Sequence, residues 1–148
     1  METPTIKFFK LDERAKIPTR AHPTDSGMDI CAIDDITIFE SEVVTVKTGI
    51  GAIIPKGYEL QIRPRSGLSS RGIWAAFGTV DEGYRGEIKV VVANVSLSEI
   101  EVNKYRIHAG DRIAQLVLVP VVRPSIEEVE KPTDETDRRE NGFGSTGK

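Results

Sequence analysis

The stretch FGTVDEGYRGEIKVVV, residues 77–92, decides the fold expected for this chain. From Glu87 onward, apolar side chains alternate with other residues at a period of two. This pattern predicts a half-buried β-strand over 87–95. The first half of the stretch has the composition of a turn-rich loop. In it Asp81, Gly83 and Gly86 are typical turn residues, because glycine reaches positive φ without a Cβ clash.

The same loop contains side chains that could bind a ligand or take part in a reaction. An acid (Asp81), an aromatic ring with a polar tip (Tyr84) and a cation (Arg85) lie within five residues. Such a group is either an ordinary solvated turn or part of a binding site, since functional residues concentrate on loops held by a rigid scaffold.

Working outward from this stretch, short apolar or β-branched segments recur on both sides, and no segment shows a sustained 3.6-residue period. The further expected strands cover 5–11, 28–32, 36–47, 49–55, 58–63, 100–107 and 113–122. Residues 68–71 suit one helical turn. Short strands separated by frequent glycine and proline predict an all-β sandwich or barrel of the jelly-roll type.

Composition narrows the class of protein. A chain of 148 residues with net charge −3 fits one domain with a real core, and it gives no reason to expect a nucleic-acid or membrane partner. Cys31 is the only cysteine. This excludes an internal disulfide, favours a reducing compartment and indicates a small buried hydrophobe. With no apolar run of about 18 residues and no apolar signal core at the amino terminus, a cytoplasmic protein is expected.

The carboxyl end differs from the rest, which predicts a β-domain over 1–130 and a flexible arm over 131–148. Phe143 is the only large apolar side chain in the arm. Such a segment cannot bury enough surface to hold itself in place. It is either a disordered tail or an arm that orders over a phosphate-bearing ligand. Arg138 and the glycine-flanked hydroxyls Ser145 and Thr146 would supply donors to that ligand.

Two other segments offer polar groups. Arg65, Ser66 and Gly67 follow an expected strand where a helical turn begins, which suits either an anion site or a capped turn with exposed arginines. Gln115 places an amide in an otherwise apolar strand, so it is either bonded to backbone or facing a ligand.

Metal chemistry has one candidate. Asp25 and Asp29 flank three residues and suit either a hydrated hard cation or a turn-forming and a capping aspartate. His22 and His108 have no neighbouring ligand cluster, which gives little support to a zinc site.

Together these segments resemble the trimeric dUTP pyrophosphatases, the dUTPases, over nearly the whole chain. Five family motifs appear in the family's order, at 25–32 (DSGMDICA), 63–68 (RPRSGL), 78–86 (GTVDEGYRG), 110–116 (GDRIAQL) and 141–147 (NGFGSTG). The resemblance implies a β jelly-roll homotrimer with active sites at subunit interfaces. The carboxyl arm of one subunit would close a site built mainly by the others.

The resemblance also implies a reaction, the hydrolysis of dUTP to dUMP and pyrophosphate with Mg²⁺ as cofactor. This reaction would limit uracil in DNA and supply dUMP for thymidylate synthesis. Asp81 would activate the attacking water, Asp29 would reach the metal through water, and the Tyr84 ring would pack on the deoxyribose. The hairpin backbone of Gly78, Thr79 and Val80 would read uracil.

The remaining implied substrate-binding residues are Arg65, Ser66, Gly67 and Gln115 on the phosphate chain and Arg138, Phe143, Gly144, Ser145 and Thr146 on the arm, with Phe143 stacking over uracil. Three positions depart from the family. Arg139 and Asn141 replace arm glycines, and Ala75 stands where the family often has Asn.

Two alternatives remain on the sequence alone. One is a relative of dCTP deaminase, which shares the fold and binds pyrimidine triphosphates. The other is a regulatory protein whose arm closes over dUTP and signals to a partner.

Overall fold

The computed structural model describes residues 2–96, 104–144 and 147. Within them the chain forms eleven β-strands and one helical turn. Their bounds are β1 Lys7–Lys10, β2 Met28–Cys31, β3 Ile36–Phe39, β4 Val43–Lys47, β5 Ile50–Ile53, β6 Tyr58–Arg63, α1 Ser66–Ser69, β7 Ile73–Ala75, β8 Gly78–Val80, β9 Lys89–Asn94, β10 Lys104–Ile107 and β11 Arg112–Pro120.

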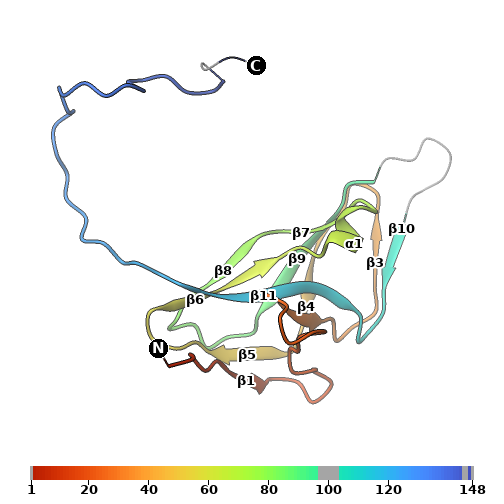
Figure 1. Cartoon of the computed structure of the whole chain (residues 1–148). Coiled ribbons are helices and arrows are strands. Elements are labelled where there is room, and N and C mark those ends of the chain that lie inside the picture. Colours follow the sequence, from red (N-terminus) through yellow and green to blue (C-terminus); the bar gives the residue numbers. More distant parts are fainter. Residues whose placement is uncertain (1, 97–103, 145–146, 148) are drawn as a thin grey trace.

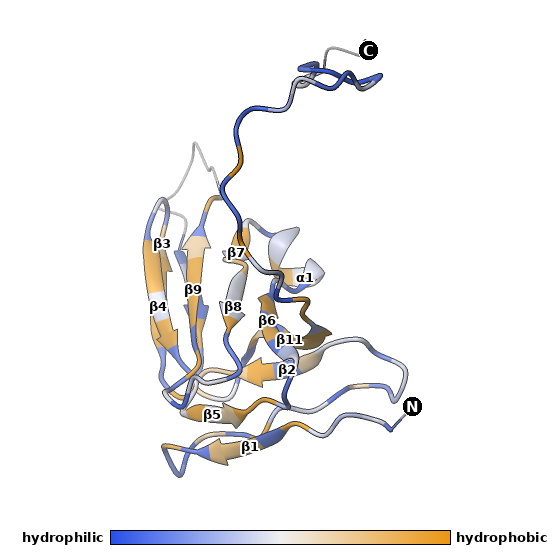
Figure 2. Cartoon of the chain, turned by 90° about the vertical axis from the view of Figure 1, so that its left-hand side faces the viewer, coloured by the Kyte–Doolittle hydropathy of each residue, from blue (hydrophilic) through white to orange (hydrophobic). Residues whose placement is uncertain are grey.

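The strands form two main sheets, one with β9 as its inner strand and the other with β11 and β6 inside (Figure 2). One has the strand order β2-β11-β6-β8 and the other β4-β9-β7. Two smaller antiparallel pairs, β1 with β5 and β10 with β3, complete the described β-structure. The predicted all-β, jelly-roll-like fold is confirmed.

The core lies where both main sheets turn their apolar faces inward. Leu60 and Leu116 from the first sheet and Val46, Val90 and Val92 from the second are all buried. The two-residue alternation predicted in β6 and β9 therefore holds, because every second side chain of a strand points to the same face.

The decisive stretch is more regular at its start than its composition predicts. Gly78–Val80 is strand β8, not loop, and the preceding strand β7 was not predicted. β8 pairs with β6, whereas β9 pairs with β4 and β7, so the stretch passes from one sheet to the other. The hairpin named for residues 78–80 is therefore not formed by β8 and β9 pairing with each other.

The glycines of the loop also have a different role from the predicted one. Neither Gly83 nor Gly86 has positive φ. A β-turn does form, because the Tyr84 N–H donates to the Asp81 carbonyl at 3.0 Å. Glycine is needed at Gly86 for space, since a Cβ there would lie 2.4 Å from the Tyr84 hydroxyl oxygen.

Other boundaries shifted by small amounts. The segment 36–47 is two strands, because Glu40, Ser41 and Glu42 form a turn in which Ser41 has a φ of 64°. Residues 100–103 of the strand expected at 100–107 lie outside the described residues, and 104–107 are β10.

After β11 the chain leaves the β-body as one extended segment (Figure 1). Every residue from 122 to 141 is exposed, and Ile126 keeps 97% of its surface accessible. A division between a β-domain and an arm at residue 130 stays a prediction. None of the helices in the described residues has the length and apolarity needed to span a membrane.

Candidate active site

Two cavities on the described part of the chain collect most of the predicted site residues. The first, the arginine cavity, has a volume of about 590 Å³, and its lining includes Asp29, Arg65, Ser66, Gly67 and Gln115. The second, the Asp81 cavity, has a volume of about 360 Å³, and its lining includes Gly78, Thr79, Val80, Asp81 and Tyr84. No described residue lines both cavities, so a single chain keeps the two sets of groups apart.

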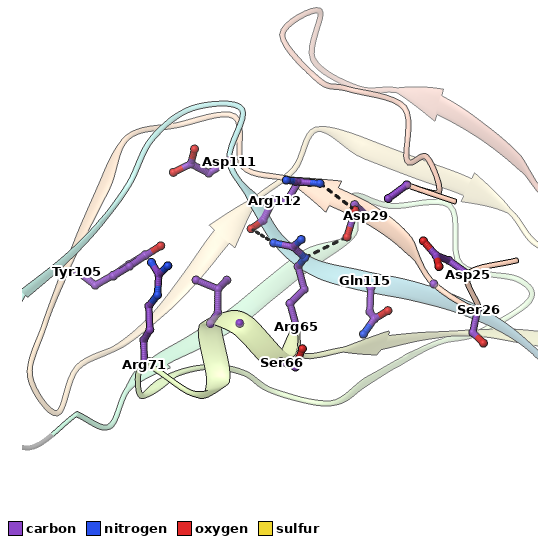
Figure 3. A pocket seen from close by; sticks show the side chains of 14 residues that line it. Asp25, Ser26, Asp29, Arg65, Ser66, Arg71, Tyr105, Asp111, Arg112 and Gln115 are labelled. Carbon is purple, nitrogen blue, oxygen red and sulfur yellow. Dashed lines mark hydrogen bonds and ion pairs between the residues drawn. The ribbon is translucent and has the colours of Figure 1, made fainter. Parts of the chain in front are cut away.

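The arginine cavity is organised around the carboxylate of Asp29, which lies in the middle of β2 (Figure 3). Arg65 Nε lies 3.1 Å from its Oδ1, and Arg112 Nη1 lies 3.6 Å from its Oδ2. Arg65 Nη1 also donates to the Arg112 carbonyl at 3.5 Å. One partly buried carboxylate therefore holds two guanidinium groups at the edge of the cavity.

The Gln115 amide is bonded to backbone, one of the two predicted alternatives, and it also faces a cavity. It donates from Nε2 to the Pro64 carbonyl at 2.9 Å and lines the arginine cavity. Its position depends on Gly27, because a Cβ on that residue would lie 2.1 Å from Gln115 Oε1. The bond to Pro64 also ties β11 to the segment that leads into α1.

The helical turn α1 carries Ser66 and Gly67 and has no buried residue. Its backbone bonds begin at Leu68, whose N–H donates to the Arg65 carbonyl at 3.2 Å. The N–H groups of the first residues of a helical turn have no partner inside it and are open to a ligand. The indole N–H of Trp74 fixes the other end of the turn by donating to the Ser69 carbonyl at 3.1 Å.

The Asp81 cavity lies beside the free edge of β8, which is the last strand of its sheet. Asp81 is exposed there. The Tyr84 hydroxyl donates to the Glu87 carbonyl at 2.9 Å, so the ring is fixed across the loop at both ends. A carboxylate, a held aromatic ring and an unpaired strand edge thus face one space.

The residue after Asp81 has a structural role. Glu82 Oε2 accepts a hydrogen bond from the Gly57 N–H at 2.9 Å and lies 3.0 Å from Arg123 Nη2. The Gly57 N–H, followed by the charge of Arg123, lowers the pKa of the Glu82 carboxyl below its usual value. Glu82 therefore anchors the loop to the β5–β6 connection, whereas Asp81 and Glu87 line the cavity. Glu87 Oε2 already accepts hydrogen bonds from the Thr48 and Gly49 N–H groups.

Comparison with known proteins decides the family. The dUTPase family model matches residues 13–147. The chain is 45% identical over 145 residues to the deoxyuridine 5'-triphosphate nucleotidohydrolase of Crocosphaera subtropica, covering 96% of this chain and 98% of that protein. The Clostridium novyi protein of the same name is 45% identical over 93% of this chain and 95% of its own length. The chain belongs to the dUTPase family.

Solved dUTPase structures share the fold. The dUTPase of Staphylococcus bacteriophage 80alpha with dUpNHpp has a TM-score of 0.87 and 32% identity, covering 98% of this chain and 99% of that chain. A point mutant of the dUTPase from the S. aureus phage phi11, described with a structural Mg(II) ion, has a TM-score of 0.78 and 30% identity, covering 86% of this chain and 97% of that one. The predicted family is confirmed.

Sequence reasoning assigned no role to several residues that line the two dUTPase cavities. Arg71, Tyr105 and Arg112 line the arginine cavity, and Ile62 and Lys89 line the Asp81 cavity. Arg112 lies within the motif at 110–116, but the motif does not indicate its partner. The structure shows that its guanidinium pairs with the Asp29 carboxylate. Arg71 had no signal, because it is one of many exposed arginines.

The structure settles three minor expectations, on Asp25, Asp29 and Cys31. The turn-forming alternative holds for Asp25, whose Oδ2 accepts the His22 N–H at 2.8 Å. The capping alternative for Asp29 is wrong, because its carboxylate pairs with two arginines. Cys31 is half-buried and not fully buried as expected, and its burial raises the pKa of the thiol.

The predicted arm residues lie far along the extended segment in this dUTPase chain. Phe143 is fully exposed, and Arg138 donates from Nε to the Asn141 carbonyl at 3.1 Å. Arg139, one of the three expected departures from the family, has a φ of 49°, a conformation that favours glycine. Ser145 and Thr146 lie outside the described residues.

Proposed function

We propose that this protein hydrolyses dUTP to dUMP and pyrophosphate, with Asp81 activating the water that attacks the α-phosphorus. The observation that carries the proposal is the Asp81 cavity, where this carboxylate shares one space with the Tyr84 ring and the free edge of β8. Relatives 45% identical over nearly the whole chain are deoxyuridine 5'-triphosphate nucleotidohydrolases.

The edge of β8 is suited to reading a base. Among the described residues β8 has a neighbouring strand on one side only, so within Gly78–Val80 every second residue directs its backbone N–H and C=O to the open side. These groups would pair with the polar edge of uracil and would be left unpaired by cytosine, which is a strong source of discrimination. With the base paired to this edge, the wall of the cavity would also exclude a 5-methyl group.

In the chemical step, contact between the base and the attacking water matters more than the strength of the base. Asp81 would accept a proton from the water as its oxygen bonds to the α-phosphorus. The bond from that phosphorus to the bridging oxygen then breaks, and pyrophosphate leaves. The Tyr84 ring would pack on the deoxyribose and leave no room for a 2′-hydroxyl.

Charge on the phosphates would be met by the arginine cavity and the arm. Arg65, Ser66, Gly67 and Gln115 would bind the phosphate chain, with the arm supplying Arg138, Phe143, Gly144, Ser145 and Thr146. Because the two cavities are separate on one chain, a homotrimer that apposes the Asp81 cavity of one subunit to the arginine cavity of another would complete each site. An arm from a neighbouring subunit would then close it.

Mg²⁺ fits this site as a companion of the triphosphate. In the described residues no group of three or more His, Cys, Asp or Glu is placed to hold a metal ion. Asp29 nevertheless offers a carboxylate in the arginine cavity. One carboxylate is enough to contact a Mg²⁺ ion through its bound water, because Mg²⁺ keeps several waters and takes its other ligands from the substrate phosphates. When bound, the ion would neutralise phosphate charge and fix the triphosphate conformation.

In the cell this reaction would limit uracil in DNA and supply dUMP for thymidylate synthesis. The substrate is a small molecule, and the proposal includes no nucleic-acid or membrane partner.

A substrate panel tests the proposal. Pyrophosphate release is expected with dUTP and at least about 100-fold less with dTTP, dCTP or UTP, because each of these either clashes with the cavity wall or leaves backbone groups unpaired. The panel is measured with Mg²⁺ and with EDTA. Ammonia release from dCTP would instead indicate a deaminase, and no turnover of dUTP would overturn the proposal.

A second prediction concerns Gly86. Replacing it with Ala is expected to push the Tyr84 ring out of position, because the new Cβ would lie 2.4 Å from the hydroxyl oxygen. We expect kcat/KM for dUTP to fall about 10-fold or more, because the ring would no longer position the deoxyribose. The ratio of dUTP to UTP turnover should fall as well, because the ring would no longer exclude the 2′-hydroxyl.

Gly83→Ala is the matched control in the same loop. A Cβ at Gly83 meets nothing within 4 Å, and its φ is not positive. It should leave both values near those of the wild type. Equal losses in the two variants would show that the loop, and not the ring, governs sugar selection.

A further inference from the structure

The carboxylate of Asp29 is the most enclosed acid among the ion pairs of the described residues. Its side chain is 18% exposed, and that of its partner Arg65, at 30%, is the least exposed of the paired cations. In each of the other described ion pairs the side chain of the cation is more than half exposed, and exposed pairs contribute little. The pair of Asp29 and Arg65 is instead partly buried on both sides, so the surrounding protein restricts how its two side chains lie.

Local structure does not fix Arg65 by itself. The residue precedes α1, outside β6, with extended backbone and no side-chain cap bond. A free arginine side chain samples many rotamers, and restricting it on binding costs conformational entropy. The carboxylate at 3.1 Å from Nε and the Arg112 carbonyl at 3.5 Å from Nη1 hold the guanidinium from two sides before any ligand arrives.

We infer that Asp29 is a positioning residue that pre-orients Arg65 for a phosphate group, and that it does so without a metal ion. The inference rests on the proposed function, since it assumes that Arg65 binds the phosphate chain of dUTP. Asp29 lies in β2, opposite Gln115 of β11, and its N–H donates to the Thr19 carbonyl at 2.8 Å. The carboxylate is therefore fixed by two strands and is a firm support for a mobile side chain.

Two other roles of Asp29 make different predictions. If the carboxylate acted only through a hydrated Mg²⁺, removing its charge would matter only when the metal is present. If it acted only as a nearby negative charge, removing it would tighten the binding of an anion. Positioning predicts weaker binding with and without metal.

The test is the affinity of the full chain for dUpNHpp, measured by calorimetry in EDTA and again with Mg²⁺. In EDTA, Asp29→Asn is expected to raise Kd about 10-fold, the lower range for losing a charge-assisted hydrogen bond. Asp111→Asn is the matched control. Asp111 lines the same cavity, but its carboxylate accepts the His108 N–H at 2.8 Å and contacts neither Arg65 nor Arg112 in the described structure. It should stay within about twofold of the wild type, the small effect expected of an exposed charge.

A double-variant cycle separates positioning from a general structural effect. In an Arg65→Gln background, Asp29→Asn should cause little further loss, because its effect passes through Arg65. The inference is overturned if Asp29→Asn binds dUpNHpp in EDTA as well as the wild type, or if its roughly 10-fold effect persists in the Arg65→Gln background. If Asp29→Asn fails to fold, Asp29→Glu keeps the charge but displaces it, and normal binding by that variant overturns the inference equally.

The proposed function fails separately. A wild-type chain that binds dUpNHpp but does not hydrolyse dUTP would overturn the reaction and leave the positioning result intact. A wild-type chain that hydrolyses dUTP, with unimpaired Asp29→Asn binding, would overturn the positioning role alone.

Discussion

Replacing Asp81 with Asn is expected to lower kcat for dUTP about 1,000-fold while leaving the affinity for dUpNHpp within a fewfold of the wild type. The amide has nearly the same shape as the carboxylate but cannot accept a proton from the attacking water, and general-base catalysis typically contributes factors of this size. The side chain is exposed, so its replacement should not disturb the core. Single-turnover pyrophosphate release and calorimetry measure the two quantities.

Glu82→Gln is the matched control for Asp81→Asn, with the same change of charge one residue away. Glu82 is tied to Gly57 and Arg123 and does not line the Asp81 cavity. Its replacement should leave kcat nearly unchanged and lower only the stability of the loop. Wild-type rates in the Asp81→Asn variant would remove Asp81 from the role of base.

Ending the chain after Lys131 is expected to lower kcat/KM for dUTP at least about 100-fold, because the arm residues that would cover the phosphates are lost. The thermal unfolding of the β-body should be nearly unchanged. All described strands end by Pro120, and every residue from 122 to 141 is exposed. Steady-state kinetics, thermal unfolding and analytical ultracentrifugation measure the activity, the stability and the oligomeric state.

A variant within the arm controls for the truncation. Lys131 Nζ and Glu140 Oε1 lie 3.0 Å apart with both side chains more than four-fifths exposed. Glu140→Gln removes the negative charge of this ion pair and keeps every arm residue proposed to bind substrate, so it should retain wild-type activity. An active truncated chain would reduce the segment to a passive tail.

The parts of the fold that were predictable are those set by local pattern. Alternation in 58–63 and 87–95 placed Leu60, Val90 and Val92 in the core, because the side chains of a strand point to opposite faces in turn. β7 and β8 were missed, because strands of three residues are too short for a period to be read from them.

The candidate site was predictable as a set of residues and not as an arrangement. Asp81, Tyr84, Arg65, Ser66 and Gln115 were identified from their motifs, and each lines one of the two cavities. Their motifs do not show that the two groups face different spaces, or that Gly86 is required by the Tyr84 ring and not by its own φ.

By itself, the sequence determined the all-β class, the apolar positions of the longer strands and membership of the dUTPase family, since period and motif order are written along the chain. Only the tertiary structure decided that β8 ends its sheet with a free edge, and that Asp29 of β2 holds Arg65 and Arg112. The reason is that strand neighbours and ion pairs join segments distant in sequence. The sheet order, which no local pattern encodes, brings those segments together.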